Sequence, residues 1–243
     1  MGIIWGKRYF GGFRIALESF GEKCVYSNDY DKYAKETYQM NFCEIPDDDI
    51  RYVDEKDIPD HDILCASFLC QSFSVSGKQL GFCDERGTLF FDVARIIREK
   101  RPMVVLLENV KNTIIDLGYS FQYSILNPVD YGISQKRERI YMVCFRNDIA
   151  RKKFTFPKPF KLNRFVEDFL LDDDMVKDLI INREDLVLNE KANLNFNLVS
   201  TIRVGTVGKG VQGERIYSPK GIAITLSAYS QRMCKNNGIS WRF

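Results

Sequence analysis

A short apolar run at residues 103–107 (MVVLL) limits the fold of this chain more than any other feature. A strand with one face in water alternates apolar and polar residues, whereas a strand without polar positions is covered on both faces. Strands of that kind lie in parallel sheets that helices cover on both sides. Residues 63–68 (ILCASF) are almost as apolar, so we expect an α/β fold built on a buried, mostly parallel sheet.

Expected strands and helices alternate as far as about residue 145. We expect strands at 23–27, 63–68, 103–107, 120–126 and 140–145, and helices at 13–20, 32–42 and 89–100. Asp31 comes directly before the second helix and is a favoured N-cap residue. This order predicts βαβ units and a doubly wound sheet.

The character of the sequence changes after the segment 156–160 (FPKPF). A last helix is expected at 165–171 and an acidic turn at 172–174, after which the chain is polar and rich in turns. Glycines cluster at positions 205, 208, 210 and 213, which indicates either unusual backbone angles or a flexible loop. We therefore expect a first domain at 1–167 and a smaller, irregular or β second domain at 168–243.

Composition favours an intracellular globular protein. The net charge of +2 over 243 residues is too small to indicate a nucleic-acid partner by itself. The seven cysteines include no CxxC pair, which favours reduced thiols over a disulfide framework. No apolar run reaches the roughly 18–20 residues of a membrane span, and the N-terminus has no signal-peptide pattern. A cytoplasmic location is expected.

Three groups of reactive residues adjoin the ends of expected strands. Cys70 follows the first of the two apolar strands, Glu108 follows the second, and Arg137 and Arg139 precede the last. In open α/β sheets, ligands bind at the carboxyl edge. Each residue also has an ordinary interpretation, as a buried thiol, a strand-end carboxylate or a solvated basic surface. Together they favour an active site, although their spacing does not identify a substrate.

His61 is the only histidine of the chain. The base of a Cys–His hydrolase must face its thiol. The strand between them would place His61 roughly 30 Å from Cys70, at about 3.3 Å per residue. A zinc cluster also lacks ligands. We therefore expect His61 to be a surface or strand-cap residue without a catalytic role, and we expect no metal site.

The motifs around these residues resemble those of the DNA (cytosine-5) methyltransferases. The matching motifs are CQSFS at 70–74, ENV at 108–110 and QKRER at 135–139, and the similarity extends through 77–100, 130–148 and 207–229. It is closest to the bacterial restriction–modification enzymes that methylate GCGC. The resemblance implies a Rossmann-like, S-adenosylmethionine-dependent sheet with a second, target-recognition domain. It also implies S-adenosyl-L-methionine as cofactor and double-stranded DNA as partner.

The chemistry of that family gives each catalytic candidate a role. Cytosine C5 becomes nucleophilic only once C6 carries an adduct, so the Cys70 thiolate is expected to attack C6. Glu108 would protonate or hydrogen-bond N3, Arg139 would hold the O2 edge, and Arg137 would support the site and lower the thiol pKa. None of this can occur inside a stacked duplex, so the cytosine must flip out.

The resemblance also implies binding residues. A loop at 72–87 would close over the flipped base. Contacts to DNA are expected from Ser76, from Gln212, which would fill the emptied space in the duplex, and from Arg215 in the major groove. The residues expected around the cofactor are Gly11, Gly12, Asp29, Tyr30, Asp49, Ile50 and Leu89. Asp29 suits ribose hydroxyls, Tyr30 suits adenine, and the glycines precede a helix whose backbone N–H groups face the methionine end.

Three features depart from the family pattern. Residues 1–10 stand where the family has an apolar first strand and half of its Phe-Ala-Gly-x-Gly-Gly loop, so the central strand is missing or replaced. Leu69 replaces a proline that would stiffen the backbone presenting the thiol. Only nine residues, 111–119, separate Val110, at the end of the ENV motif, from the strand expected to begin at Ser120, whereas a parallel crossover needs about a dozen or more. Either these strands connect differently or the sheet is strained there.

Beyond Tyr229 the sequence no longer follows the family, which continues through its recognition domain and returns a C-terminal helix to the catalytic domain. Their absence predicts an exposed apolar face and reduced stability. Ser230 and Gln231 replace family glycines, so the DNA target can differ from GCGC. Two hypotheses follow. The chain is an active DNA cytosine-5 methyltransferase, or it is an inactive remnant or split-enzyme fragment that keeps affinity for DNA or for a complementary C-terminal fragment.

Overall fold

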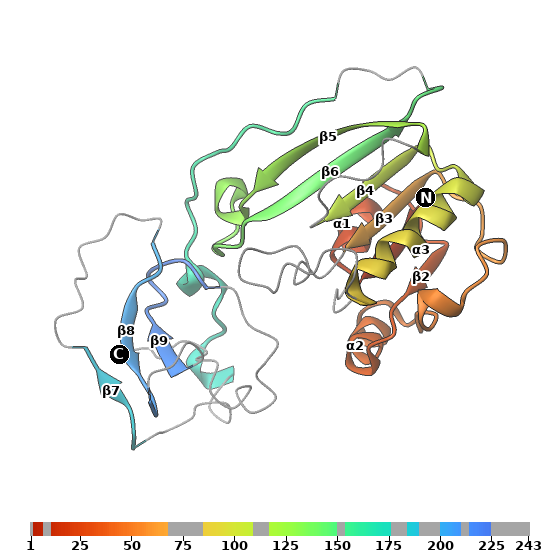
Figure 1. Cartoon of the computed structure of the whole chain (residues 1–243). Helices are drawn as coiled ribbons and strands as arrows, with labels where there is room; N and C mark the ends of the chain where they lie inside the picture. Colours follow the sequence, from red (N-terminus) through yellow and green to blue (C-terminus); the bar gives the residue numbers. More distant parts are fainter. Residues whose placement is uncertain are drawn as a thin grey trace. The chain divides into compact units, whose positions relative to one another are not determined.

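The strands in the described part of the chain form two β-sheets, one of six strands and one of three (Figure 1). The computed structural model describes residues 2–6, 11–67, 85–108, 117–149, 154–175, 184–189, 200–209 and 214–224. The chain divides into two compact units. The first comprises Met1–Ile125 and Arg139–Phe156, and the second comprises Leu126–Glu138 and Pro157–Phe243.

The first unit contains the six-stranded sheet, in the order β2-β1-β3-β4-β6-β5. Its strands are β1 (Gly2–Gly6), β2 (Tyr26–Asn28), β3 (Ile63–Ser67), β4 (Val104–Glu108), β5 (Tyr119–Leu126) and β6 (Arg139–Arg146). The strands β2, β1, β3 and β4 run parallel, and β6 runs antiparallel to β4. The predicted α/β class with a largely parallel sheet is therefore confirmed.

Among the described residues of the first unit, three helices and a short 3-10 turn accompany these strands. They are α1 (Gly12–Glu18), α2 (Lys32–Phe42), α3 (Glu85–Lys100) and η1 (Ile50–Tyr52). The carboxylate of Asp31 accepts hydrogen bonds from the backbone N–H groups of Tyr33 and Ala34, as a helix N-cap does. This confirms the predicted start of α2. Among the described residues, no helix is both long and apolar enough to cross a membrane.

The core of the first unit lies where α3 packs on the middle of the sheet. Leu64 of β3 and Leu107 of β4 belong to the same buried cluster as Val93 and Ile97 of α3. All four side chains are at most 1% exposed. Burying a side chain of this kind stabilises the fold by roughly 1.5–3 kcal/mol. The apolar runs that predicted a sheet covered by helices therefore form its centre.

The strand β1 forms although the N-terminal sequence departs from the family pattern. Ile3 pairs with Tyr26 of β2 and with Leu64 of β3, so β1 lies between those two strands. A strand in this position satisfies the backbone groups of both neighbours, and its Ile-Ile-Trp sequence has high β propensity. Of the two alternatives, a missing or a replaced central strand, the structure shows a replaced one.

The short connection between β4 and β5 does not join neighbouring strands. In the sheet order, β6 lies between β4 and β5. The expected alternation of βαβ units therefore ends at β4, because the next strand of the sheet is antiparallel. Of the two consequences expected from the short connection, the sheet order favours a different arrangement of the strands.

The second unit contains the three-stranded antiparallel sheet β7-β8-β9. Its elements are η5 (Pro128–Tyr131), η6 (Val166–Phe169), η7 (Asp173–Met175), β7 (Val187–Leu188), β8 (Arg203–Thr206) and β9 (Arg215–Tyr217). Val129, Leu162 and Ile222 form a small buried core, against which Phe165 packs. The sequence predicted a smaller, irregular or β second domain at 168–243, whereas this compact unit also includes residues 126–138 and 157–167.

The helix expected at 165–171 is shorter than predicted. Only the 3-10 turn η6 forms, and Leu170 is already extended, with φ −78° and ψ 141°. The backbone N–H groups of Val166 and Glu167 donate to the carbonyls of Gly221 and Pro219. These tertiary hydrogen bonds satisfy N–H groups that have no partner within a helix, and they fix the start of the segment against residues 219–221.

His61 was expected at the surface or at the start of a strand, and because it is buried, only the second of these places is correct. It precedes β3, is only 8% exposed, and its Nδ1 lies 2.9 Å from the carbonyl oxygen of Pro59. Ile58, three residues earlier, is buried in the core cluster, so the turn that carries His61 lies close to the core. Burial lowers the pKa of His61.

We predict that mild acid destabilises the fold through His61. Its folded-state pKa lies below the ordinary value of about 6.5, so below that pH the unfolded chain binds a proton more readily. The free energy of unfolding should fall between about pH 7 and about pH 5.5. The substitution His61→Gln should remove this dependence, because the chain has no other histidine. Urea titrations at several pH values check this, and a wild-type stability constant over that interval would contradict it.

Candidate functional site

The strand register aligns the carboxyl ends of β2, β1, β3 and β4. The aligned pairs are Trp5–Asn28, Gly6–Ser67, Ser67–Glu108 and Glu108–Tyr141. Asp29, one residue beyond β2, therefore lies at the same sheet edge as Glu108. Three strand spacings of about 4.8 Å separate their strands by about 14 Å.

Glu108 forms a buried ion pair with Arg139. Glu108 is 1% exposed, and its Oε1 lies 3.2 Å from Nε of Arg139. The pair forms because β6 is antiparallel to β4, so the start of β6 lies beside the end of β4. Leu107 points into the core against α3, and the alternation of a strand turns Glu108 to the other face. Two of the predicted catalytic residues are thus in contact.

Arg137 belongs to the segment 126–138 of the second unit. Its backbone N–H donates a hydrogen bond of 3.1 Å to Oδ1 of Asn127. Lys136 and Ser134, in the same segment, form backbone hydrogen bonds with Ala223. The segment that carries Arg137 is therefore fixed within the second unit, whereas Arg139 begins a strand of the first.

The predicted nucleophile, Cys70, lies outside the described residues, three positions after the end of β3. Cys65, within β3, and Cys144, within β6, are completely buried free thiols. Burial raises the pKa of both to about 12. Neither forms appreciable thiolate at neutral pH, so neither can replace Cys70 as a nucleophile.

On the cofactor side, Asp29 is buried at the end of β2, with 6% exposed. Its Oδ1 accepts a hydrogen bond from the backbone N–H of Asp31, and Tyr30 lies between them in the chain. The neighbouring Asn28 is 3% exposed, and the Tyr26 hydroxyl lies close to its amide and to the Asp47 carboxylate without forming a well-aligned hydrogen bond to either. This edge therefore carries buried polar groups that a ligand could satisfy.

Gly11 and Gly12 begin α1. Gly11 has a left-handed backbone, with φ +88°, and a Cβ there would lie 2.2 Å from Cε2 of Phe42. Gly12 has open space around its Cα. Only glycine fits the first position, because a side chain would have both a strained backbone and a ring in its way.

Asp49 and Ile50 lie beside this edge because residue 47 forms a parallel bridge with Asn28. Asp49 caps η1, and its carboxylate accepts hydrogen bonds from the backbone and the guanidinium of Arg51. These bonds lower the pKa of Asp49. Ile50 is 1% exposed, and its carbonyl accepts a 2.6 Å hydrogen bond from Arg95 of α3.

The remaining binding candidates are distributed over both units. Leu89 of α3 packs against the core cluster that contains Ile50. Arg215 begins β9 and is exposed, while the next residue, Ile216, is buried. Ser76 and Gln212 lie outside the described residues. No group of three His, Cys, Asp or Glu side chains that could hold a metal ion occurs in the described segments.

Solved structures share the fold of this chain. The Entamoeba histolytica methyltransferase EhMeth aligns with a TM-score of 0.59 at 18% identity, over 77% of this chain and 62% of that one. A mutant of DNMT2 from Spodoptera frugiperda aligns with a TM-score of 0.53 at 23% identity, over 71% of this chain and 60% of that one. The chain therefore shares the fold of these two proteins.

Sequence comparison identifies the protein family. The family model of the C-5 cytosine-specific DNA methylases matches residues 8–241, and this chain belongs to that family. It is 60% identical to the type II methyltransferase M.HhaI of Haemophilus parahaemolyticus, over 90% of this chain and 71% of that protein. It is 45% identical to M.NgoBI of Neisseria gonorrhoeae, over 67% of this chain and 55% of that protein. The predicted family is confirmed, and the chain spans about half to three quarters of the length of these relatives.

The family uses S-adenosyl-L-methionine as methyl donor, and the residues at the sheet edge are suited to it. Asp29 offers a buried carboxylate to hydroxyl groups, and the adjacent Asn28 amide has both donor and acceptor capacity to satisfy. The left-handed turn at Gly11 brings backbone close to the start of α1. The chemistry of these groups fits a polar nucleoside ligand.

Sequence reasoning missed several residues that support this edge. Arg95 reaches the Ile50 carbonyl and also pairs with Glu55, 40 positions earlier. Arg14 contacts α2 and the residues after it. No local pattern marks such partners, because they lie far apart in the sequence. The one available signal for Arg14 was its position in the first turn of the helix after Gly11 and Gly12.

We predict that Gly11→Ala destabilises the first unit, whereas Gly12→Ala does not. The first change combines a left-handed alanine with a collision against Phe42, costing about 2 kcal/mol or more in the free energy of unfolding. The second places alanine in open space at the start of a helix. Chemical denaturation of both variants tests this, and equal stabilities would show that the turn is not constrained as described.

We also predict that Arg139→Met lowers the free energy of unfolding by about 2 kcal/mol, because the buried Glu108 loses its charged partner. The estimate is below that for a fully buried pair because Arg139 is 27% exposed. Arg98→Met, at an exposed position of α3, serves as control and should change stability by less than about 0.5 kcal/mol. Similar losses for the two variants would contradict a stabilising role of the pair.

Proposed function

We propose that this chain transfers a methyl group from S-adenosylmethionine to C5 of a flipped cytosine in duplex DNA. The observation that carries the proposal is the buried Glu108 held by Arg139 at the carboxyl edge of the sheet. Ser67, three residues before Cys70, pairs with Glu108. Glu108 and the segment leading to Cys70 thus end neighbouring strands, as a shared active site requires.

In the proposed reaction, the Cys70 thiolate adds to C6 of the cytosine, while Glu108 protonates or hydrogen-bonds N3. Arg139 donates to the O2 edge and holds Glu108 in place. Arg137 supports the site and lowers the pKa of the thiol. S-Adenosylmethionine supplies an electrophilic methyl group. After C5 is methylated, loss of the C5 proton expels the thiolate and restores the double bond between C5 and C6.

The cofactor is proposed to occupy the edge between α1 and η1. The residues assigned to it are Gly11, Gly12, Asp29, Tyr30, Asp49, Ile50 and Leu89. The burial of Asp29 supports this assignment, as does the buried Asn28 amide, which forms no well-aligned hydrogen bond within the described residues. The Asp49 carboxylate already accepts a hydrogen bond from Arg51. When it binds the adenine side of the cofactor, it would either keep this bond or release it.

DNA recognition is proposed for residues 168–243, as a partial target-recognition domain. Gln212 would fill the space left by the flipped base, and Arg215 would contact a guanine in the major groove. Ser76 would reach the DNA from the catalytic side; of the loop expected at 72–87, residues 85–87 instead form the start of α3. The exposure of Arg215 on β9 supports its role, and GCGC is the proposed target by similarity to the M.HhaI sequence.

The proposed setting is a bacterial restriction–modification system, with the chain in the cytoplasm. The names of its relatives, all type II methyltransferases, support this setting. In such a system, methylation would mark the cell's own DNA at the target sequence.

A second candidate is an inactive remnant or a split-enzyme fragment that binds a complementary C-terminal fragment. The observation that favours it is the apolar surface of β5, whose Tyr123 and Ile125 are each 63% exposed. They alternate along the strand with polar residues, so both lie on one face. An uncovered apolar face of this kind is suited to a further segment.

The test is transfer of tritiated methyl from S-adenosylmethionine to duplex DNA containing GCGC. We predict incorporation by the wild type and background incorporation by Cys70→Ala, because the thiol is the nucleophile. Cys43→Ser, at an exposed thiol, is the matched control and should keep wild-type activity. A DNA duplex with GCGC scrambled tests the target.

Equal incorporation by the wild type and Cys70→Ala would contradict the proposed mechanism. No incorporation from folded wild-type protein would reject activity of this chain alone. Addition of a polypeptide carrying the C-terminal part of M.HhaI would then separate the remaining alternatives. Restored activity would indicate a split enzyme, and continued inactivity would indicate a remnant.

A further inference from the structure

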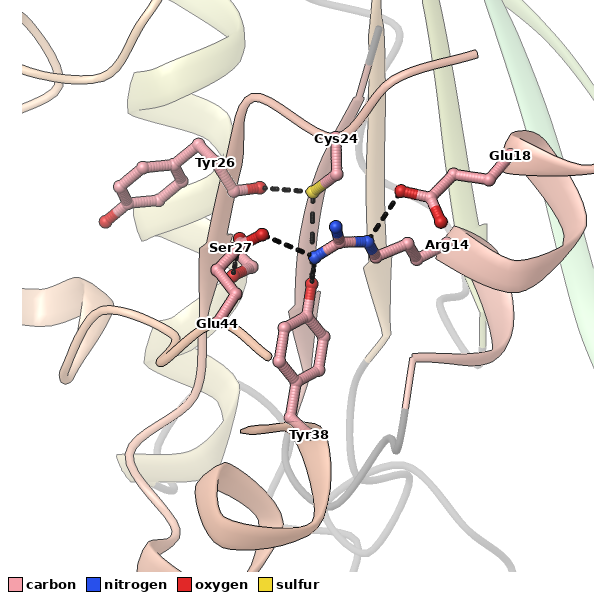
Figure 2. A network of polar contacts seen from close by, with 7 residues as sticks. All are labelled: Arg14, Glu18, Cys24, Tyr26, Ser27, Tyr38 and Glu44. Atoms are coloured by element: carbon pink, nitrogen blue, oxygen red, sulfur yellow. Dashed lines mark hydrogen bonds and ion pairs between the residues drawn. The ribbon is translucent and has the colours of Figure 1, made fainter. Parts of the chain in front are cut away.

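A polar network centred on Arg14 ties together the elements that flank the proposed cofactor edge (Figure 2). Arg14 lies in α1, and its side chain is 11% exposed. Its Nε donates to Glu18 at 2.7 Å, and its Nη1 donates to the Tyr38 hydroxyl at 2.8 Å and to Glu44 at 2.9 Å. One guanidinium therefore links α1 to α2 and to the segment beyond it.

The network continues to the strand that precedes Asp29. Ser27, in β2, donates a 3.4 Å hydrogen bond to the second carboxylate oxygen of Glu44. The Cys24 thiol donates to the Tyr26 carbonyl and lies 3.9 Å from the Tyr38 hydroxyl. Burial raises the pKa of this thiol, so it joins the network as a neutral group. The end of β2 is thereby fixed to the same centre as α1.

Arg14 also holds the ring that closes the Gly11 turn. Its guanidinium carbon lies 4.4 Å from the centroid of Phe42, which also packs 4.5 Å from the Tyr38 ring. Phe42 in turn fills the space where a Cβ of Gly11 would be, at 2.2 Å. The position of the turn before α1 thus depends on Phe42, and the position of Phe42 depends on Arg14.

Arg14 remains positively charged in this environment. Burial by itself would lower its pKa, but the hydrogen bonds to Tyr38, Glu18 and Glu44 raise the pKa above the ordinary arginine value. The geometry also needs the planar fork of arginine. A lysine ammonium is a single point charge and cannot bond three elements while stacking on a ring.

We propose that Arg14 is a positioning residue for the methyl donor. It fixes the Gly11–Gly12 turn through Phe42, and it fixes the end of β2, and so Asp29, through Glu44 and Ser27. It does not touch the reacting atoms. Its loss should weaken binding of S-adenosylmethionine and leave methyl transfer at saturating cofactor almost unchanged. The inference rests on the proposed cofactor site and deepens it.

The experiment measures the Kd of S-adenosylhomocysteine by calorimetry, together with KM and kcat for S-adenosylmethionine. Arg14→Met should raise Kd and KM roughly tenfold, as loss of an outer contact to a ligand site does, with kcat changed less than about twofold. Arg14→Lys should recover little. Tyr38→Phe should raise Kd less, and should add almost nothing to Arg14→Met because both act through one network. Arg98→Met is the matched control.

Thermal melting of each variant separates positioning from simple stability. All binding is measured well below the melting temperature, where every variant is folded. A lowered melting temperature with an unchanged Kd would overturn the proposal, and so would a loss of kcat at unchanged KM or full recovery by Arg14→Lys. If the wild type binds S-adenosylhomocysteine but transfers no methyl group, the proposed function fails while the Kd series still decides the role of Arg14. A wild type that binds no cofactor would overturn both.

Discussion

The parallel register of β1, β3 and β4 is the constraint on which the candidate site depends. It aligns Gly6, Ser67 and Glu108 at one edge, and it sets which face each side chain takes. Because side chains alternate along a strand, the burial of Leu107 against α3 directs Glu108 to the opposite face. A slip of one residue would exchange the two. Core packing by apolar side chains therefore determines where the Glu108 carboxylate lies.

Much of the first unit could be predicted because the sequence patterns that mark its strands and helices are local. The strand expected at 63–68 is observed as Ile63–Ser67, and the helix expected at 32–42 begins and ends at those residues. Features that depend on distant partners could not be read in this way. The antiparallel placement of β6 and the burial of His61 both follow from contacts made by other parts of the chain.

The candidate site shows the same division. Glu108 and Arg139 were predicted and are in contact, since each adjoins the end of a strand with a clear apolar pattern. The Arg14 network was not predicted, because Tyr38 and Glu44 lie 24 and 30 positions away from Arg14. Motif recognition identifies the groups that react or bind directly. The side chains that hold those groups in place require coordinates.

The division of the chain into units has a consequence for synthesis on the ribosome. The chain enters the second unit at Leu126, returns to the first at Arg139, and enters the second again at Pro157. Residues 134–136 bond to Ala223, so they must wait for nearly 90 more residues to be translated before their partner exists. The first unit can form β6 before then, while residues 126–138 remain an open loop. The sheet of the first unit therefore assembles first, and residues 126–138 take their place in the second unit last. Protease cleavage near residue 157 would leave residues 126–138 attached to the first unit.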